Sequence, residues 1–369
     1  MKTALLHYWL TNMRGGENVL EEFCRIWPEA DIFTHAYAPE RISEIINSHQ
    51  VNCTFINRLP RAKTDCQKYL PLMPLALKKL DLAAYDLIVS SESGPVKGIC
   101  KPKGSKHICY CHSPMRYLWD MYDDYYRNTG LAGKIAMSLF KLPLRRYDLK
   151  SAENVDHFIA NSHFVAERIK RIYGRSSTVI HPPVNVGFYV GGNYAKGDYY
   201  LFVGQLIPYK RPDLAIAACE RMNRKLVIAG DGSMRRELER IVGHNVTFAG
   251  RIQNEKLREL YAGAKALIFP GIEDFGIVPL EAQAAGTPVI ALRAGGALET
   301  VVADVTGVFF DRPDVECLCN AIEAFEMKKF SANYLTEHAQ KFSAERFRSE
   351  VNHFVCSSNH IKQFKKELG

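Results

Sequence analysis

The chain has 369 residues, which is long for one hydrophobic core and predicts about two domains. Apolar residues make up 47% and charged residues 24%, as in globular proteins, and no apolar run reaches the roughly 18 residues of a membrane-spanning helix. The formal net charge of +8 favours anionic partners such as phosphates or an anionic membrane surface. Nucleic acid is not favoured, because no zinc finger, RNP-like motif or basic coiled segment accompanies the charge.

The first residues and the cysteines together predict a cytoplasmic protein. The opening MKTALLHYWL has one lysine and a short apolar run, but no small-residue cleavage site follows. A buried first strand is therefore a better interpretation than a signal peptide. The ten cysteines are scattered, and the pairs Cys109/Cys111 and Cys317/Cys319 have no C-x-x-C partners. We expect reduced cysteines that serve packing rather than disulfides or a zinc site.

The first half of the chain alternates apolar strands with helical stretches, beginning with a strand at 3–9 and a helix at 15–27. Alternation of this kind indicates a parallel sheet with helices on both faces. Several strands end in small polar residues, where a ligand could bind. The further strands predicted in this half are residues 30–37, 85–92, 106–113 and 155–162.

The second half repeats this pattern and predicts a second doubly wound sheet. The six predicted strands are residues 199–206, 224–232, 245–250, 264–271, 287–292 and 307–311. The predicted helices between them are residues 211–222, 233–243, 254–264 and 276–286.

These patterns predict an α/β protein of two Rossmann-like domains, residues 1–185 and 186–343. The segment 177–200 between them is rich in proline and glycine, as linkers are. The tail at 344–369 is amphipathic, and we expect a helix that crosses back to the first domain. A cleft is expected where the carboxyl edges of the two sheets face each other.

The segment 269–292, FPGIEDFGIVPLEAQAAGTPVIAL, carries two glutamates around a Phe-Gly turn. Glu273 precedes the turn, and Glu281 lies in the helix that the turn begins. A carboxylate can accept two hydrogen bonds from vicinal hydroxyls, which a sugar ring and a ribose both offer. The first N–H groups of the helix would bind further hydroxyls or an anion. The alternative is a helix start with one surface charge.

Two further segments place glycine or cations where a strand meets a helix. Gly15 and Gly16 would let backbone N–H groups approach an anion, although a tight turn explains a glycine pair equally well. Lys210 and Arg211 follow the first strand of the second half and would neutralise a diphosphate leaving group. The alternative for these cations is a solvated loop.

Other strand ends carry weaker signals. Gly230 and Asp231 form a D-G turn that its geometry alone explains, although a nucleotide base or ribose could approach it. His112 follows a strand of the first half and could hydrogen-bond a substrate hydroxyl. Its alternative role is to cap a neighbouring backbone segment.

Taken together, these segments resemble GT-B-fold, retaining glycosyltransferases of family 4, which transfer sugars from nucleotide diphosphates. The resemblance spans most of the chain in order, which makes it far more specific than any one motif. The segments that carry it are RGGEN (14–18), YCHSPMRYLWD (110–120), IANSHFVAERI (159–169), VIHPPVN (179–185), VGQLIPYKR (203–211), IAGDG (228–232), EDFGIVPLEAQAAGTPVIA (273–291) and GGALETV (295–301).

The resemblance implies roles for particular residues. Catalysis is assigned to His112, Glu273 and Lys210, and His112 also meets the transferred sugar. Gly15 and Gly16 line the donor phosphates, and Lys210 and Arg211 hold the diphosphate. Glu273 and the backbone of Phe275, Gly276 and Ile277 hold the sugar, and Glu281 holds the ribose. The remaining donor-binding residues are Gln205, Gly230 and Asp231. The acceptor is assigned to His112, Arg116, Tyr117 and Trp119.

One residue departs from the family pattern, which usually has arginine where this chain has Gln205. Leaving-group stabilisation would then rest on Lys210, with help from Arg211. No D-x-D pair stands at a strand end, so we expect no metal and no other cofactor, with cations and helix N-termini in place of an ion. Front-face attack within an ion pair is the favoured retaining mechanism.

The finer pattern is similar to mannosyltransferases that build bacterial O-antigen, lipopolysaccharide and other surface polysaccharides. It implies GDP-mannose as donor and a lipid-diphosphate-linked glycan as acceptor. The segment 58–80 mixes Lys and Arg with apolar residues, which suits an anionic membrane face and favours a peripheral location on the cytoplasmic membrane. The alternative is an exposed helix with a packed underside. Two other functions stay open: a nucleotide-sugar epimerase of the same fold, and a scaffold without turnover.

Overall fold

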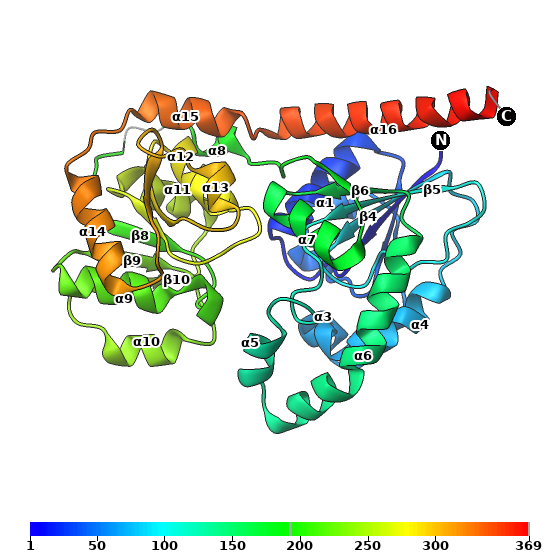
Figure 1. Cartoon of the computed structure of the whole chain (residues 1–369), viewed down its shortest axis with the longest axis horizontal. Helices are drawn as coiled ribbons and strands as arrows, with labels where there is room; N and C mark the ends of the chain where they lie inside the picture. The colour runs from blue at the N-terminus through cyan, green and yellow to red at the C-terminus, as the bar shows by residue number, and fades with distance from the viewer. Residues whose placement is uncertain (192–193, 368–369) are drawn as a thin grey trace. The chain divides into compact units, whose positions relative to one another are not determined.

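The computed structural model describes residues 1–191 and 194–367, with side chains for 1–191 and 194–357. Within it the chain forms two compact units (Figure 1). Unit 1 comprises Met1–His181 and Arg348–Gly369, and unit 2 comprises Pro182–Phe347.

Unit 1 is built on a seven-stranded sheet in which every neighbouring pair is parallel. The strand order is β3-β2-β1-β4-β5-β6-β7, so the order reverses between β1 and β4. The strands are β1 (Thr3–His7), β2 (Asp31–Thr34), β3 (Val51–Cys53), β4 (Leu87–Glu92), β5 (Lys106–Cys111), β6 (His157–Ala160) and β7 (Ser177–Val179).

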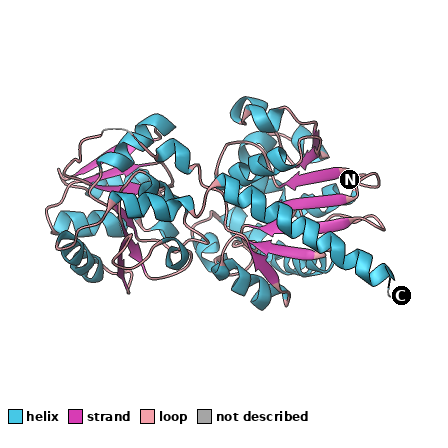
Figure 2. Ribbon diagram, turned by 90° about the horizontal axis from the view of Figure 1, so that it is seen from above, coloured by secondary structure: helices cyan, strands magenta, loops and turns pink. Residues whose placement is uncertain are grey.

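Helices cover both faces of this sheet, and Figure 2 shows the strands flanked by them. Full burial of β1, β4 and β5 explains why none of their sequences alternates strictly between apolar and polar residues. The helices are α1 (Gly15–Ile26), α2 (Glu44–Asn47), α3 (Ala62–Asp65), α4 (Met73–Lys78), α5 (Tyr122–Arg127), α6 (Leu131–Glu153) and α7 (His163–Tyr173).

Unit 2 contains a six-stranded parallel sheet of order β10-β9-β8-β11-β12-β13, which reverses between β8 and β11. Its two main clusters of buried apolar residues lie on the two faces of the sheet. The strands are β8 (Tyr200–Val203), β9 (Leu226–Ala229), β10 (Val246–Gly250), β11 (Leu267–Phe269), β12 (Val289–Leu292) and β13 (Gly307–Phe310).

The helices of unit 2 precede, connect or follow these strands. They are α8 (Val186–Tyr189), α9 (Pro212–Arg221), α10 (Arg235–Ile241), α11 (Asn254–Gly263), α12 (Ile277–Ala284), α13 (Ala297–Thr300), α14 (Val315–Glu326) and α15 (Ala332–Gln340). The last helix, α16 (Ala344–Glu367), begins in unit 2, and its residues from Arg348 onward belong to unit 1. There Arg348 forms an ion pair with Glu22 of α1, and Phe354 contacts the His157 ring.

The predicted fold class is confirmed: both halves form doubly wound parallel sheets. Strands β3 and β7 were missed, because each has only three residues and neither is fully buried. The segment 177–200, interpreted as a linker, instead begins with strand β7 and contains helix α8. Residues 192–193 of that segment, and the last two residues of the predicted tail helix, lie outside the described residues.

Candidate active site

The candidate donor residues of unit 2 gather at the point where its strand order reverses. In a doubly wound sheet, the loops after the strands on either side of this point leave in opposite directions and open a crevice. Here those loops follow β8 and β11, and they carry Lys210 and Glu273. The sequence separates these two residues by more than sixty positions, and the topology brings them together.

Lys210 and Glu273 form an ion pair, with 2.7 Å between Nζ and Oε1. Both side chains are mostly covered, with 15% and 21% exposed. The close approach depends on Gly271, because a Cβ there would lie 2.7 Å from the Lys210 Cα. The Glu273 backbone is fixed as well, since its carbonyl accepts a hydrogen bond from the Gly296 N–H at 2.8 Å.

Glu281 lies on α12 and is half-buried, with its carboxylate held by two tyrosines. The Tyr261 hydroxyl donates to Oε2 at 2.9 Å, and the Tyr189 hydroxyl also donates to this carboxylate. Burial raises the pKa of Glu281, while the two tyrosine hydrogen bonds and the charge of Lys210 act in the opposite direction. The effect of Lys210 shows that its charge reaches both glutamates of the segment.

Phe275 and Gly276 have different roles in the turn between the two glutamates. The Phe275 side chain is buried, with its ring 5.8 Å from that of Phe342, so only its backbone is available to a ligand. Gly276 has φ +100° and caps α12, a conformation that favours glycine. Helix α12 begins at Ile277, so its first N–H groups lack intrahelical acceptors.

Unit 2 contains four other predicted donor residues, and for three of them the structure shows a contact with a neighbouring residue. The Arg211 guanidinium pairs with Asp213 at 3.0 Å. A Cβ on Gly230 would lie 1.8 Å from the Gly204 carbonyl oxygen, so packing between β8 and β9 requires glycine there. Asp231 accepts a hydrogen bond from the Gly232 N–H at 2.8 Å. Gln205 is exposed at the carboxyl end of β8.

In unit 1, His112 follows β5 at the carboxyl edge of the sheet, near the reversal between β1 and β4. The Ser91 hydroxyl lies 2.8 Å from its Nε2, and the same hydroxyl lies 3.0 Å from the Nδ1 of His7. Burial lowers the pKa of His112 to about 3. His112 is therefore a neutral imidazole at ordinary pH.

The glycine pair predicted to line the phosphates forms the start of α1, which begins at Gly15. A Cβ on Gly16 would lie 2.5 Å from the Tyr8 hydroxyl oxygen, so a larger residue here would displace the end of the Tyr8 side chain. The backbone N–H groups of this first turn have no intrahelical acceptors.

The three predicted acceptor residues beyond His112 follow it in the same loop. The Trp119 indole N–H donates to Asp148 at 2.7 Å, and the Arg145 guanidinium lies 4.8 Å from the Trp119 ring. The Tyr117 hydroxyl donates to the Met115 sulfur at 2.9 Å. Arg116 is half-buried. The indole N–H and the Tyr117 hydroxyl thus serve contacts inside unit 1.

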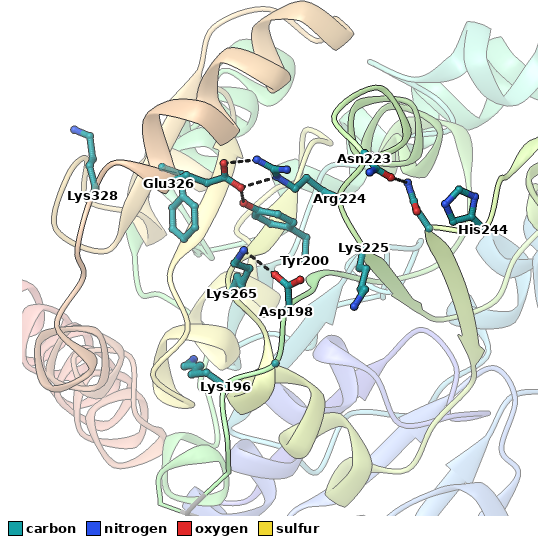
Figure 3. Close-up of a pocket in the computed structure, with 13 residues that line it drawn as sticks. Lys196, Asp198, Tyr200, Asn223, Arg224, Lys225, His244, Lys265, Glu326 and Lys328 are labelled. Atoms are coloured by element: carbon teal, nitrogen blue, oxygen red, sulfur yellow. Dashed lines mark hydrogen bonds and ion pairs between the residues drawn. The ribbon is translucent and has the colours of Figure 1, made fainter.

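A separate hollow lies at the opposite, amino edge of the sheet in unit 2 (Figure 3). Four of its charged lining residues form two ion pairs, Arg224 with Glu326 at 2.7 Å and Lys265 with Asp198 at 2.9 Å. It contains none of the predicted site residues. Ligands of doubly wound sheets bind at the carboxyl edge, so we place the candidate site there.

Two absences hold for the described residues only. No group of three or more His, Cys, Asp or Glu side chains is arranged to hold a metal ion. Likewise, none of the helices searched is both long and apolar enough to cross a membrane.

Sequence reasoning did not single out Ser91, Tyr189 or Tyr261, although each contacts a predicted site residue, or His7, which contacts Ser91. Ser91 could have been predicted, because β4 was recognised as a strand with small polar residues at its end. The tyrosines carry no local signal, since only the fold brings α8 and α11 against α12.

Comparison with known proteins identifies the class of this fold. Anabaena HepE in complex with UDP-glucose aligns over 97% of this chain and 100% of its own, with 18% identity and a TM-score of 0.72. Sucrose-phosphate synthase from Thermosynechococcus elongatus aligns over 98% and 100%, with 19% identity and a TM-score of 0.73. These similarities define a GT-B fold.

The sequence comparisons identify the family. Residues 13–188 match Glycosyltransferase Family 4, and residues 190–342 match Glycosyl transferases group 1. A D-inositol 3-phosphate glycosyltransferase of Kribbella flavida is 30% identical over 72% of this chain and 80% of its own length. The alpha-1,3/1,6-mannosyltransferase ALG2 of Mus musculus is 25% identical over 78% and 77%. The chain belongs to this family of GT-B glycosyltransferases.

Other relatives match over shorter stretches. An uncharacterized glycosyltransferase of Methanocaldococcus jannaschii is 35% identical over 40% of each chain. In this and two further relatives, the match spans 40% to 49% of their length, so this chain corresponds to about half of each.

Proposed function

We propose that this protein is a retaining, metal-independent glycosyltransferase that moves mannose from GDP-mannose to a lipid-linked or polysaccharide acceptor. The observation that carries the proposal is the cluster of Lys210, Glu273 and Glu281 at the carboxyl edge of unit 2. One cation and two carboxylates at this edge support binding of a nucleotide diphosphate sugar.

The cluster fits the three parts of such a donor. The Lys210 ammonium can neutralise charge that develops on the diphosphate as the glycosidic bond breaks. Glu273 can accept hydrogen bonds from sugar hydroxyls, and Glu281 from the ribose diol. The Tyr261 and Tyr189 hydroxyls fix the Glu281 carboxylate before a ribose binds.

The choice of mannose has two supports. The segments 111–120 and 208–216 resemble surface-polysaccharide mannosyltransferases, and one relative with matched length is a mannosyltransferase. HepE binds UDP-glucose in its crystal structure, but at 18% identity this likeness concerns the fold alone.

We further propose that the acceptor is presented at an anionic membrane surface that unit 1 contacts. In the segment 58–80, Leu72 and Leu75 are 41% and 52% exposed, and basic side chains lie beside them. A longer apolar surface lies on α6, which sequence analysis did not identify. Its exposed residues are Leu131, Ile135, Leu139 and Leu142, each at least 61% exposed.

These α6 residues are spaced by four, four and three positions, so they form one stripe along the helix, termed here the α6 stripe. The same helix carries five basic residues, Lys134, Lys141, Arg145, Arg146 and Lys150. Its one buried acid, Asp148, is already neutralised by Lys97. In Figure 1, α5 and the first half of α6 extend away from the sheet of unit 1. An apolar stripe flanked by cations is complementary to anionic lipid.

A thermal-shift panel tests the donor. The panel contains GDP, UDP, ADP and their mannose, glucose and N-acetylglucosamine conjugates, with EDTA present throughout. A ligand that binds only the folded protein raises Tm by mass action. We expect GDP and GDP-mannose to raise Tm. A shift with uridine nucleotides alone would replace the donor, and no shift with any nucleotide would favour a scaffold.

A turnover assay then distinguishes a glycosyltransferase from an epimerase. The protein is incubated with the donor, with and without a lipid-diphosphate acceptor, and the nucleotide and sugar products are analysed. Conversion of the donor to another nucleotide sugar without acceptor would favour an epimerase. Transfer that needs the acceptor and continues in EDTA is the expected result.

A further inference from the structure

Four polar side chains of unit 1 form a continuous line that ends at His112. The line begins at Glu17 on α1, passes through His7 at the end of β1 and Ser91 on β4, and reaches His112 after β5. His7 and Ser91 are paired directly in the register of the two strands. Glu17, His7 and Ser91 are each no more than 2% exposed, so no bulk water completes their hydrogen bonds.

The Ser91 hydroxyl restricts which proton positions are allowed. It lies 3.0 Å from His7 Nδ1 and 2.8 Å from His112 Nε2. A hydroxyl has one hydrogen and two lone pairs, so it either donates to one imidazole and accepts from the other, or accepts from both. The protonated nitrogens of the two histidines are therefore coupled, because a bare Nδ1 on His7 takes the hydroxyl hydrogen and leaves a lone pair for a proton on His112 Nε2.

Glu17 decides between these arrangements. Its Oε1 lies 3.6 Å from His7 Nε2, and neither that nitrogen nor Glu17 Oε2 has a hydrogen-bond partner in the described part of the chain. A carboxylate offers only lone pairs, so a proton on His7 Nε2 gives attraction, whereas a bare nitrogen there would give repulsion in a buried space. Doubly protonated His7 would add a buried charge without a close hydrogen bond, which is costly.

The proton positions then follow along the line. His7 carries its proton on Nε2 and accepts at Nδ1 from the Ser91 hydroxyl. Ser91 in turn accepts from the Nε2–H of His112, and this leaves Nδ1 of His112 without a proton. The low pKa of His112, about 3, keeps the ring in this neutral form.

We infer that Glu17, acting through His7 and Ser91, fixes the tautomer of His112 so that its Nδ1 is a hydrogen-bond acceptor for a substrate hydroxyl. Glu17, His7 and Ser91 are thus positioning residues. A bare nitrogen attracts an O–H donor and repels phosphate oxygens, so His112 selects a sugar hydroxyl rather than the diphosphate. This ligand assignment rests on the proposed function, whereas the tautomer does not.

The tautomer is measured directly by NMR. Full-length protein with ¹⁵N-labelled histidine gives long-range ¹H–¹⁵N correlations that distinguish protonated from bare ring nitrogens, and the His112→Gln spectrum assigns the His112 signals. We expect the Nε2–H form of His112 in the native protein. The Nδ1–H form, or a doubly protonated His7, would overturn the inference.

Variants test whether Glu17 and Ser91 carry the effect. Glu17→Leu removes the carboxylate, and Ser91→Ala breaks the line without altering Glu17; both are expected to convert the His112 signals to a mixture of tautomers. Glu17→Gln is the matched control, because its amide oxygen still accepts a hydrogen bond. The unchanged Nε2–H form in both Glu17→Leu and Ser91→Ala would overturn the role of the line. If Glu17→Leu does not fold, Ser91→Ala decides alone.

Titration with GDP-mannose tests the ligand. Hydrogen bonding of a sugar hydroxyl to Nδ1 is expected to shift that ¹⁵N resonance, whereas GDP alone is expected to leave it in place. Equal shifts with both would overturn the assignment to a hydroxyl. Absence of any nucleotide binding would instead contradict the proposed function, and the tautomer measured without ligand would still stand or fall by itself.

Discussion

The Lys210 ammonium lies 2.7 Å from the Glu273 carboxylate, across the point where the strand order of unit 2 reverses. An ammonium has three N–H donors, so pairing with Glu273 is compatible with simultaneous contact to phosphate oxygens. The pair also places two opposite charges together on side chains that are mostly covered. Removing Lys210 and removing Glu273 should therefore change the affinity for a diphosphate ligand in different ways.

Lys210→Met should weaken binding of a nucleoside diphosphate by about 10- to 100-fold, since a charge-assisted hydrogen bond contributes roughly 1.5–3 kcal/mol. The unpaired Glu273 carboxylate would add repulsion toward the phosphates. Isothermal titration calorimetry with GDP and UDP measures the change. Arg211→Met is the matched control, because Arg211 is paired with Asp213 and should lose less affinity.

A substitution of Glu273, which pairs with Lys210, makes this test more specific. Glu273→Gln removes the repulsive carboxylate, so diphosphate affinity should stay equal or increase, while sugar transfer falls. An equal loss of GDP affinity in Lys210→Met and Glu273→Gln would contradict separate roles for the two residues.

Gln205 allows a gain-of-function test. It is exposed in the loop after β8, the same loop that carries Lys210. If its side chain faces the diphosphate, Gln205→Arg should tighten GDP binding by about tenfold and make the affinity more sensitive to salt. Titrations at low and high ionic strength measure both effects. Unchanged affinity at low salt would show that position 205 does not contact the ligand.

Glu281 gives a pH-dependent prediction. Its pKa in the folded protein is raised by burial above the ordinary value of 4.5, so the folded state binds this proton more tightly than the unfolded state. This contribution to stability is present at acidic pH and is lost as pH rises through the folded pKa. Glu281→Gln should therefore raise Tm relative to the native protein at pH 8, with a difference that shrinks toward pH 4.

The same substitution should weaken nucleotide binding, because an amide is a poorer partner than a carboxylate for both ribose hydroxyls. Tyr261→Phe is a useful comparison, since it removes one hydrogen bond to Glu281 but leaves the carboxylate in place. Thermal unfolding across pH with and without GDP measures both effects. A Tm difference that grows as pH falls would contradict the sign of the pKa shift.

The sequence was sufficient for the fold because the strands at the centres of both sheets are buried on two faces. Strands such as β1, β4 and β12 contain short runs of apolar residues, and these runs are a strong signal. The edge strands β3 and β7 lack it, because half-buried three-residue segments resemble loops.

The candidate site was only partly predictable, for a topological reason. Glu273 and Glu281 lie on one segment, so their relation could be inferred locally. The pairing of Lys210 with Glu273 and the line from Glu17 to His112 depend on which strand ends become neighbours. Helix α6 was missed because its apolar residues face outward instead of into a core.

A buried ionic cluster next to Ser91 predicts a large effect on stability. Lys97 lies 3.0 Å from Glu92 and also pairs with Asp148, and all three side chains are no more than 1% exposed. Lys97→Met would leave two buried carboxylates without their cation, which should lower the free energy of unfolding by about 3–5 kcal/mol. Lys68→Met, which breaks the exposed pair with Asp65, should cost less than about 1 kcal/mol.

Urea denaturation followed by circular dichroism compares these two variants with the native protein. Glu92 and Asp148 each accept two further hydrogen bonds, which Lys97→Met leaves in place. The variant therefore tests the loss of the cation alone. A loss as small as that of Lys68→Met would show that the carboxylates become neutral or reach water when the lysine is absent.

The α6 stripe predicts membrane binding that depends on both apolar and basic residues. Replacing Ile135 and Leu139 with glutamate removes two exposed apolar side chains and adds negative charge, so binding to vesicles that contain phosphatidylglycerol should fall by at least tenfold. Both residues are more than 60% exposed, so the fold should not change. Ile241 and Met327 of unit 2, which are also exposed, supply the matched control when replaced by glutamate.

Cosedimentation with vesicles of phosphatidylcholine alone, and with added phosphatidylglycerol, measures this binding, and analytical ultracentrifugation without lipid measures self-association. Native protein should bind only the anionic vesicles, with affinity that decreases at high salt, because the five cations of α6 act by charge while the stripe inserts. If the Ile135/Leu139 variant binds as well as the native protein, the stripe does not face lipid. If it instead converts a native dimer to a monomer, the stripe is the interface between two copies of the chain.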